Sequence, residues 1–462
     1  MKPSASPHRP RVTLVAAALG FVVVLLDVSV VNVALEALRQ EFGADVSGLQ
    51  WVLNAYTLVF AALLLTSGAL GDRFGARRTF TCGLVLFTLA SAACGLAPNL
   101  VALVAARAIQ GLGAALLVPN SLSMLQQAFP DPVQRSRAVG WWGAIGGASL
   151  AAGPVLGGLL IAHAGWRSIF LINLPVGLIG LCLAVRPTES GNAVHHHSLD
   201  LPGQVAIVSA LAALTVALTE AGRLGWQHSW VQGGLMLALL AALAFVRVER
   251  RSPAPMLPLA LFRIPTFTVA SLASLAGVIV NFAYYGLIFV FSLFFQIEQQ
   301  LSPEQTGLAF LPMTIVLMVV NVIAGRLITR IGARRLMALG LALSAFGYLL
   351  LLPVRIDGPY GMLVVPMLLA ASGIALTVPT MTNATLSSVE SSRAGIASGV
   401  LNSARQVGDM LGVAVFGYLV RDTAPEAFMR GMHRSLGISV ALLLAASLLC
   451  LFGMPEDRTR AS

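Results

Sequence analysis

Long apolar runs separated by short polar segments make up most of the 462-residue chain. A helix needs about 20 consecutive apolar residues to cross the hydrocarbon core of a bilayer. The pattern therefore predicts an all-α polytopic membrane protein with fourteen membrane-spanning helices. The predicted helices cover residues 12–35, 49–71, 79–97, 100–123, 138–162, 168–185, 202–219, 231–247, 266–294, 306–327, 335–353, 360–381, 396–419 and 436–453.

An internal repeat indicates two related halves. The segment Gly68–Arg78 and the segment Gly325–Arg335 share a glycine- and arginine-rich pattern at a spacing of 257 residues. Two homologous halves that rock around a central site are common in secondary transporters. We therefore expect two pseudo-symmetric six-helix bundles plus two inserted helices. The expected boundaries are 1–186 for the first bundle, 187–262 for the inserted pair with its cytoplasmic linkers, and 263–462 for the second bundle.

The basic residues predict the orientation. If the N-terminus is cytoplasmic, 20 of the 29 Lys and Arg residues lie on the inside, 7 outside and 2 within helices, whereas the acidic residues split 8 to 9. This is the positive-inside pattern, to which acidic residues contribute little. Both termini are therefore expected in the cytoplasm. Because the net charge of +10 is spread over these loops, the expected surroundings are lipid rather than nucleic acid.

Composition excludes several mechanisms. Hydrophobic residues form 57% of the chain and charged residues 10%, whereas soluble domains carry about 25% charged residues. The only lysine is Lys2, so the sequence lacks the lysine with which a P-loop contacts nucleotide phosphates. Transport must then be driven by a gradient or by a separate subunit. The four cysteines lie in apolar runs without a CxxC pair, so we expect no metal site and no cofactor.

Several segments combine glycine, proline and polar residues at fixed spacings. They are Leu26-Asp27-Val28-Ser29-Val30-Val31-Asn32, Gly68-x-Leu70-x-Asp72-Arg73-x-Gly75-x-Arg77-Arg78, Arg107-x-x-Gln110-Gly111-x-Gly113, Gly153-Pro154-x-x-Gly157-Gly158 and the stretch 165–177.

Together these segments resemble the signatures of the major facilitator superfamily, and within it the fourteen-helix drug:proton antiporters. That group includes bacterial exporters of antibiotics such as methylenomycin. The resemblance covers nearly the whole chain, and the stretch 165–177 makes the subgroup more specific than the superfamily. It implies a bacterial cytoplasmic membrane protein that works without a cofactor, and we expect a monomer.

The segment 68–78 resembles the superfamily's cytoplasmic gate, which here comprises Gly68, Asp72, Arg73, Gly75, Arg77 and Arg78. Glycines permit a tight turn, and Asp72 can pair with basic groups or with a helix N-terminus. That lock would hold the cytoplasmic side closed. The alternative is a basic loop that serves only insertion. In the second copy Thr329 takes the place of Asp72, so we expect an asymmetric gate.

The segment Gly153, Pro154, Gly157 and Gly158 resembles the helix motif associated with exporters rather than importers. Proline bends a helix, and glycines allow a facing helix to approach. Ordinary packing of small residues is the alternative.

Asp27, Asn32, Arg107 and Gln110 are the candidates for proton coupling or substrate binding. Burial favours the neutral form of an acid, so Asp27 can gain and lose a proton. A buried arginine costs about 2.5–3.5 kcal/mol on insertion scales, so Arg107 needs an acceptor. Both residues could instead be purely structural, and Asp27 could bind a cationic substrate.

Arg405 and Asp409 are the second candidate pair. They are four residues apart and share a helix face, so they could form an ion pair. The alternatives for Asp409 are a second titrating site or a residue near water at a helix end. Aromatic residues between Phe282 and Phe295 could hold flat drugs or serve packing, and His195–His197 is expected to be a solvated loop.

The sequence thus predicts a proton-coupled exporter of small hydrophobic or amphipathic compounds. A metabolite transporter of the same fold is the nearest alternative. A membrane-embedded enzyme would need a catalytic cluster inside the bilayer, and the predicted helices contain only Asp27 and Asp409 as clear acids. We therefore expect no enzyme activity.

Overall fold

Every regular element in the described part of the chain is helical. The computed structural model describes residues 8–185, 200–252, 255, 265–388 and 394–454. The helices are α1 (His8–Val33), α2 (Leu35–Phe42), α3 (Val46–Phe74), α4 (Ala76–Gly95), α5 (Leu100–Ala128), α6 (Pro132–Ala164), α7 (Ser168–Leu171), α8 (Asn173–Val185), α9 (Leu201–Leu224), α10 (Ser229–Glu249), α11 (Pro265–Leu293), the π-helical turn η2 (Phe294–Glu298), α12 (Pro303–Ile331), α13 (Ala333–Leu350), α14 (Gly361–Ser387), α15 (Ala394–Leu419) and α16 (Pro425–Gly453).

The prediction of an all-α polytopic membrane protein is confirmed. Among the described residues, 13 helical segments are long and apolar enough to cross a membrane, and the short helix α7 joins α8 in one of them. The remaining predicted span, 396–419, corresponds to α15, which is helical but lies outside that set. The polar residues Arg405, Gln406 and Asp409 lower its hydropathy, so it depends on neighbouring helices to shield them.

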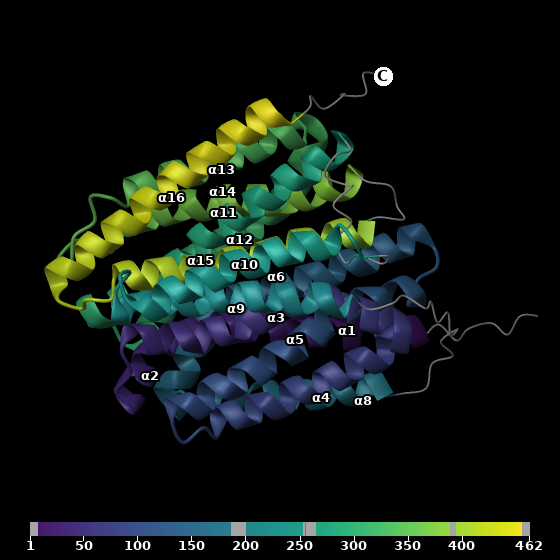
Figure 1. The fold of residues 1–462 in the computed structure, drawn as a ribbon, viewed down its shortest axis with the longest axis horizontal. Helices are drawn as coiled ribbons and strands as arrows, with labels where there is room; N and C mark the ends of the chain where they lie inside the picture. The colour runs from purple at the N-terminus through teal and green to yellow at the C-terminus, as the bar shows by residue number, and fades with distance from the viewer. Residues whose placement is uncertain (1–7, 186–199, 253–254, 256–264, 389–393, 455–462) are drawn as a thin grey trace, which may run out of the picture.

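Figure 1 shows the early helices gathered in the lower part of the molecule and the later ones in the upper part. The two groups meet along two seams, where α3 lies against α15 and α6 lies against α12. Helix α9 contacts both α3 and α15, and α10 packs mainly on α9. The start of α1 and the end of α16 lie at the same end of the bundle (Figure 1). We call it the terminal end, and the opposite end, where α2 lies, the α2 end.

The sequence repeat produces the same turn twice. Gly75 joins α3 to α4 with φ +93°, and Gly332 joins α12 to α13 with φ +85°. Non-glycine residues rarely adopt this left-handed region, whereas glycine does so without a steric penalty. The glycines of the repeat thus form two matching tight corners, one in each half.

Two of the boundaries that differ from the prediction lie at the α2 end. The first membrane helix ends at Val33, and the chain continues as α2, which buries Leu35 and Leu38 while Glu36 accepts hydrogen bonds from Arg39 and Gln40. The last helix begins at Pro425 rather than at residue 436. Both extensions are amphipathic turns at the α2 end. Polar residues interrupt the apolar run there, so a prediction based on such runs misses the true helix ends.

Close helix contacts depend on glycine. A Cβ added at Gly113 of α5 would lie 2.7 Å from the backbone nitrogen of Phe87 in α4. A Cβ added at Gly373 of α14 would lie 2.3 Å from the carbonyl oxygen of Gly340 in α13. Small residues at such positions let membrane helices approach backbone to backbone.

We predict that Gly373→Ala lowers the free energy of unfolding by about 1–3 kcal/mol, because overpacking forces the backbones of α13 and α14 apart. The thermal midpoint of the purified protein in detergent would measure the loss. Gly233→Ala in α10 is the matched control, since a Cβ there meets nothing within 4 Å. That control should be neutral or slightly stabilising, because alanine favours helix. Equal midpoints for the two variants would contradict the prediction.

Candidate functional site

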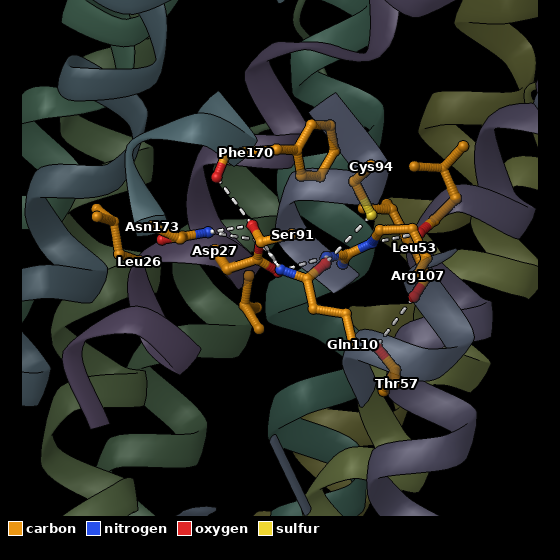
Figure 2. A network of polar contacts seen from close by, with 12 residues as sticks. Leu26, Asp27, Leu53, Thr57, Ser91, Cys94, Arg107, Gln110, Phe170 and Asn173 are labelled. Carbon is orange, nitrogen blue, oxygen red and sulfur yellow. Dashed lines mark hydrogen bonds and ion pairs between the residues drawn. The ribbon is translucent and has the colours of Figure 1, made fainter. Parts of the chain in front are cut away.

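Asp27 of α1 and Arg107 of α5 form an ion pair at the centre of the first half. Their side chains are 0% and 1% exposed, respectively. Figure 2 shows the pair at the centre of a polar network enclosed by helices. A charge this deep in a membrane protein is tolerated only with a partner, and each residue is the other's ionic partner.

Two side-chain amides, which are held in turn by a serine hydroxyl, complete the hydrogen bonding of the Asp27 carboxylate. Gln110 donates from Nε2 to Asp27 Oδ1 at 2.8 Å and accepts from Arg107 Nη1 at 2.8 Å. Asn173 of α8 donates to the same Asp27 oxygen at 3.2 Å. Ser91 of α4 accepts from both amides and donates to the carbonyl of Phe170. The network therefore joins α1, α4, α5 and α8.

Sequence reasoning found Asp27, Arg107 and Gln110 but missed Ser91 and Asn173. Asn173 belongs to the segment 165–177, which supported the family resemblance but whose residues were assigned no function. Ser91 lies in an apolar helix and has no signal of its own.

Arg107 is also held from the side. Its Nε donates to the carbonyl of Val52 in α3 at 3.0 Å, and its guanidinium lies 4.3 Å from the centroid of the Tyr56 ring. A Cβ added at Gly111 would lie 2.4 Å from the carbonyl oxygen of Tyr56. Glycine at this position brings α5 close enough to α3 for these contacts.

The glycines of α6 face two different helices. A Cβ added at Gly153 would lie 1.7 Å from Ser29 Oγ in α1, and one at Gly157 would lie 3.2 Å from the carbonyl oxygen of Val30. Ser29 and Val30 follow Asp27 by only two and three residues in α1. The helix that carries the acid is therefore packed directly against α6.

The other glycine of the motif faces the second half. A Cβ at Gly158 would lie 2.5 Å from the carbonyl oxygen of Pro303, at the start of α12. In return, a Cβ at Gly307 of α12 would lie 2.4 Å from the carbonyl oxygen of Pro154. The α6–α12 seam is thus closed by direct backbone contact.

Asn32 lies apart from the ion pair. Its side chain donates to the carbonyl of Val28 in its own helix at 2.9 Å, while its backbone carbonyl accepts a hydrogen bond from Ser292 of α11. The structure therefore places Asn32 at a contact between the two halves rather than beside Asp27.

In the gate segment, Arg77 donates to the carbonyl of Ala184 at 2.6 Å, which anchors the last turn of α8 within the first half. Asp72, Arg73 and Arg78 are exposed at the terminal end. Asp72 forms no hydrogen bond or ion pair with any other described residue, so the lock expected there is not engaged in this conformation.

The predicted ion pair between Arg405 and Asp409 is wrong. Among the described residues no ion pair joins them, and Arg405 Nε has no hydrogen-bond partner. The aliphatic stem of Arg405 packs on Gly277 of α11, whereas the Asp409 carboxyl interacts with the Thr57 hydroxyl of α3. A shared helix face made the pair feasible, but the two side chains turn towards different helices. Asp409 is 5% exposed, so it does not lie near water at a helix end.

The remaining candidates lie away from this network. Most of the aromatic residues of α11 and η2 are buried in the second half, where Phe282 packs edge-on against Phe416 of α15 at 5.2 Å. His195–His197 lies outside the described residues. No group of three or more His, Cys, Asp or Glu side chains in the described ranges could hold a metal ion. A cavity of about 360 Å³ lies between α9 and α10, and its lining, which includes Glu220 and Trp230, contains neither Asp27 nor Asp409.

Comparison with known proteins identifies the family. The model of the Major Facilitator Superfamily matches residues 17–413. The chain belongs to this superfamily. The Methylenomycin A resistance protein of Streptomyces coelicolor is 38% identical over 416 residues, or 89% of this chain and 86% of that protein. Multidrug resistance protein Stp of Mycobacterium tuberculosis is 37% identical over 88% of this chain and 75% of that protein.

The fold agrees with that membership. A D-xylose-proton symporter superposes with a TM-score of 0.72 at 16% identity, covering 98% of this chain and 99% of that one. At this identity the likeness shows the fold alone. Membership of the superfamily, together with the relatives above, makes the chain a multi-span membrane transporter of a small molecule rather than an enzyme, as its sequence predicted.

We predict that Arg107→Gln destabilises the protein by about 3–5 kcal/mol, because it leaves Asp27 without a counter-charge in a buried site. The double variant Asp27→Asn/Arg107→Gln should recover much of that loss, since neither charge remains. Thermal midpoints in detergent would measure both. Glu41→Gln is the control, because its partner Arg167 is 43% exposed and such pairs contribute about 0–1 kcal/mol. The single variant Asp27→Asn completes the comparison, and a loss in the double variant equal to the sum of the two single losses would contradict the pairing argument.

Proposed function

We propose that the chain is a proton-coupled exporter of small hydrophobic or amphipathic compounds that works by alternating access. The observation that carries the proposal is the buried Asp27–Arg107 pair, with its carboxylate bonded to Gln110 and Asn173. Resistance to methylenomycin A and to multiple drugs is what the names of the relatives describe. Export is a direct route to such resistance.

Protonation of Asp27 would change the electrostatic interactions that stabilise this site. The ionised carboxylate accepts hydrogen bonds from an arginine and two amides, and all of these favour the charged form. A proton on Asp27 removes the ionic attraction and leaves Arg107 as an unpaired buried cation, which is costly. The site then gains free energy by rearranging, and that difference between states is what couples a proton to a conformational change.

Helix α6 is the route by which this change would reach the second half. Gly153 and Gly157 hold it against α1 beside the acid, and Gly158 and Pro154 hold it against α12. Because packed interfaces shift between discrete arrangements rather than deforming smoothly, a displacement of α1 would alter the α6–α12 seam. In this proposal a substrate enters while Asp27 is ionised, and a proton that enters from the outside neutralises Asp27 and favours release of the substrate.

We further propose that the terminal end faces the bacterial cytoplasm, as the basic residues indicate. The transporter would act as a monomer in contact with lipid. The expected division at 1–186, 187–262 and 263–462 would make α9 and α10 the inserted pair between two six-helix bundles.

We predict that Asp27→Asn abolishes substrate-induced proton movement in proteoliposomes while the protein remains folded. Asparagine keeps the shape of the side chain but cannot titrate. The measurement is proton release on addition of compounds chosen from a drug-susceptibility panel in a host without its own pumps. Glu41→Gln removes an exposed acid instead and should keep wild-type coupling. Undiminished coupling in Asp27→Asn would exclude this residue as the proton carrier, and absence of coupling in the wild type would refute the proposed function.

We predict that Asp72→Asn shifts the transporter towards the conformation open at the terminal end. Charge-assisted hydrogen bonds formed by Asp72 only in the other conformation would be worth about 1.5–3 kcal/mol, which moves populations roughly ten- to a hundredfold. Cysteine labelling from each side of the membrane would detect more access at the terminal end and less at the α2 end. Thr329→Ala, at the matching position of the repeat, is the control and should label like the wild type. Unchanged labelling in Asp72→Asn would argue for a role in insertion only.

A further inference from the structure

Gln50 connects the two halves at the α2 end. It lies in the second turn of α3, and its Nε2 group donates to the carbonyl oxygens of Val413 at 2.8 Å and Ala414 at 2.7 Å, both in α15. The side chain is buried, with 1% of the residue exposed. Both hydrogens of one amide group are thus used on successive carbonyls of the facing helix.

Helix α15 provides a slot for this amide. A Cβ added at Gly417 would lie 2.2 Å from Gln50 Nε2 and 2.4 Å from its Cδ. Any residue larger than glycine at this position would displace the amide from the carbonyls. The fit therefore depends on two residues, one from each half.

These contacts exist only while the α2 ends of α3 and α15 touch. When the α2 end opens, the Gln50 amide passes to water and the carbonyls lose their second donor. We propose that Gln50 is a gating residue whose two hydrogen bonds hold the α2 end of the α3–α15 seam closed. The inference rests on the proposed alternating-access function and adds a specific contact to it.

The chemistry of the contact gives a signature that simple packing would not. Only a donor can bind two carbonyl oxygens, and a carboxylate in the same place would be repelled by them. Because the hydrogen bonds favour one conformation alone, their loss changes the ratio of conformations by their whole differential free energy. For two neutral hydrogen bonds the expected change is about tenfold.

The experiment measures the width of the α2 end directly. Spin labels are placed at Ala44→Cys and Thr423→Cys, one on each half, in a chain whose four native cysteines are replaced by alanine. Electron–electron distance distributions in nanodiscs give the ratio of wide to narrow conformations. No substrate or proton gradient is needed, so this result is independent of whether the wild type shows proton-coupled export.

We expect Gln50→Ala to raise the wide-to-narrow ratio about tenfold, and Gly417→Ala to raise it similarly by displacing the amide. Gln50→Glu should raise the wide-to-narrow ratio further. If packing alone mattered, Gln50→Glu would give a ratio between those of the wild type and Gln50→Ala. The matched controls are Gln232→Ala, an exposed residue of α10, and Gly437→Ala, where a Cβ meets nothing within 4 Å. Both should give the wild-type distribution.

Wild-type distributions for Gln50→Ala, Gln50→Glu and Gly417→Ala would overturn the proposal. An increase in Gln50→Ala without one in Gln50→Glu would also overturn it, because it would show that donation to the carbonyls is irrelevant. If Gln50→Ala fails to fold, Gly417→Ala tests the same contact with Gln50 intact.

Discussion

A charged side chain inside a membrane protein needs protein groups that replace the water around it, and the structure of the first half follows from that constraint. Removing a carboxylate and a guanidinium from water is costly, and mutual attraction repays this only when further hydrogen bonds satisfy the remaining groups. Asp27 and Arg107 therefore recruit Gln110, Asn173 and Ser91 from the surrounding helices. These partners can approach only because glycines in α5 let α3 and α4 pack against it. The small residues and the polar network are thus two parts of one solution.

Close packing at glycines also connects the helix of Asp27 to the boundary between the two halves. Ser29 and Val30 follow Asp27 on α1, and they fill the space left by Gly153 and Gly157 on α6. The residues that directly follow these two glycines, Pro154 and Gly158, meet the backbone of α12. No long pathway is required, since the first helix, the motif helix and the opposite half are consecutive neighbours. A motif interpreted from sequence as a device for close packing thus also connects the helix that carries the acid to the α6–α12 seam.

Sequence reasoning succeeded where one segment carries the signal and failed where the answer depends on a partner. Apolar runs predicted the helices, and a lone acid and a lone arginine in such runs predicted the core of the site. Ser91 and Asn173 were missed because their roles exist only once α4 and α8 lie beside α1. The Arg405–Asp409 pair was wrong because helical spacing shows which side chains could meet, but not which neighbouring helix attracts each one. Gln50 gave no signal, since the polar group it serves is the backbone of α15.

Helix α3 occupies a position from which both acids can be affected. Tyr56 lies over Arg107, and the next residue, Thr57, interacts with Asp409 in the opposite half. Ser47, Trp51 and Asn54 on the same helix hydrogen-bond Thr219 and Glu220 of α9. Among the described residues, the polar contact from α9 to α15 joins the Thr215 hydroxyl to the sulfur of Met410. A thioether sulfur is a weaker acceptor than the oxygen atoms that α3 and α9 share. When α3 and α15 part, fewer hydrogen bonds are lost if α9 stays with α3. In the proposed alternating-access cycle the α9–α10 pair would therefore move with the half that contains the Asp27–Arg107 pair, and the contact of α9 with α15, which has the weaker bonding, would be the one that slides.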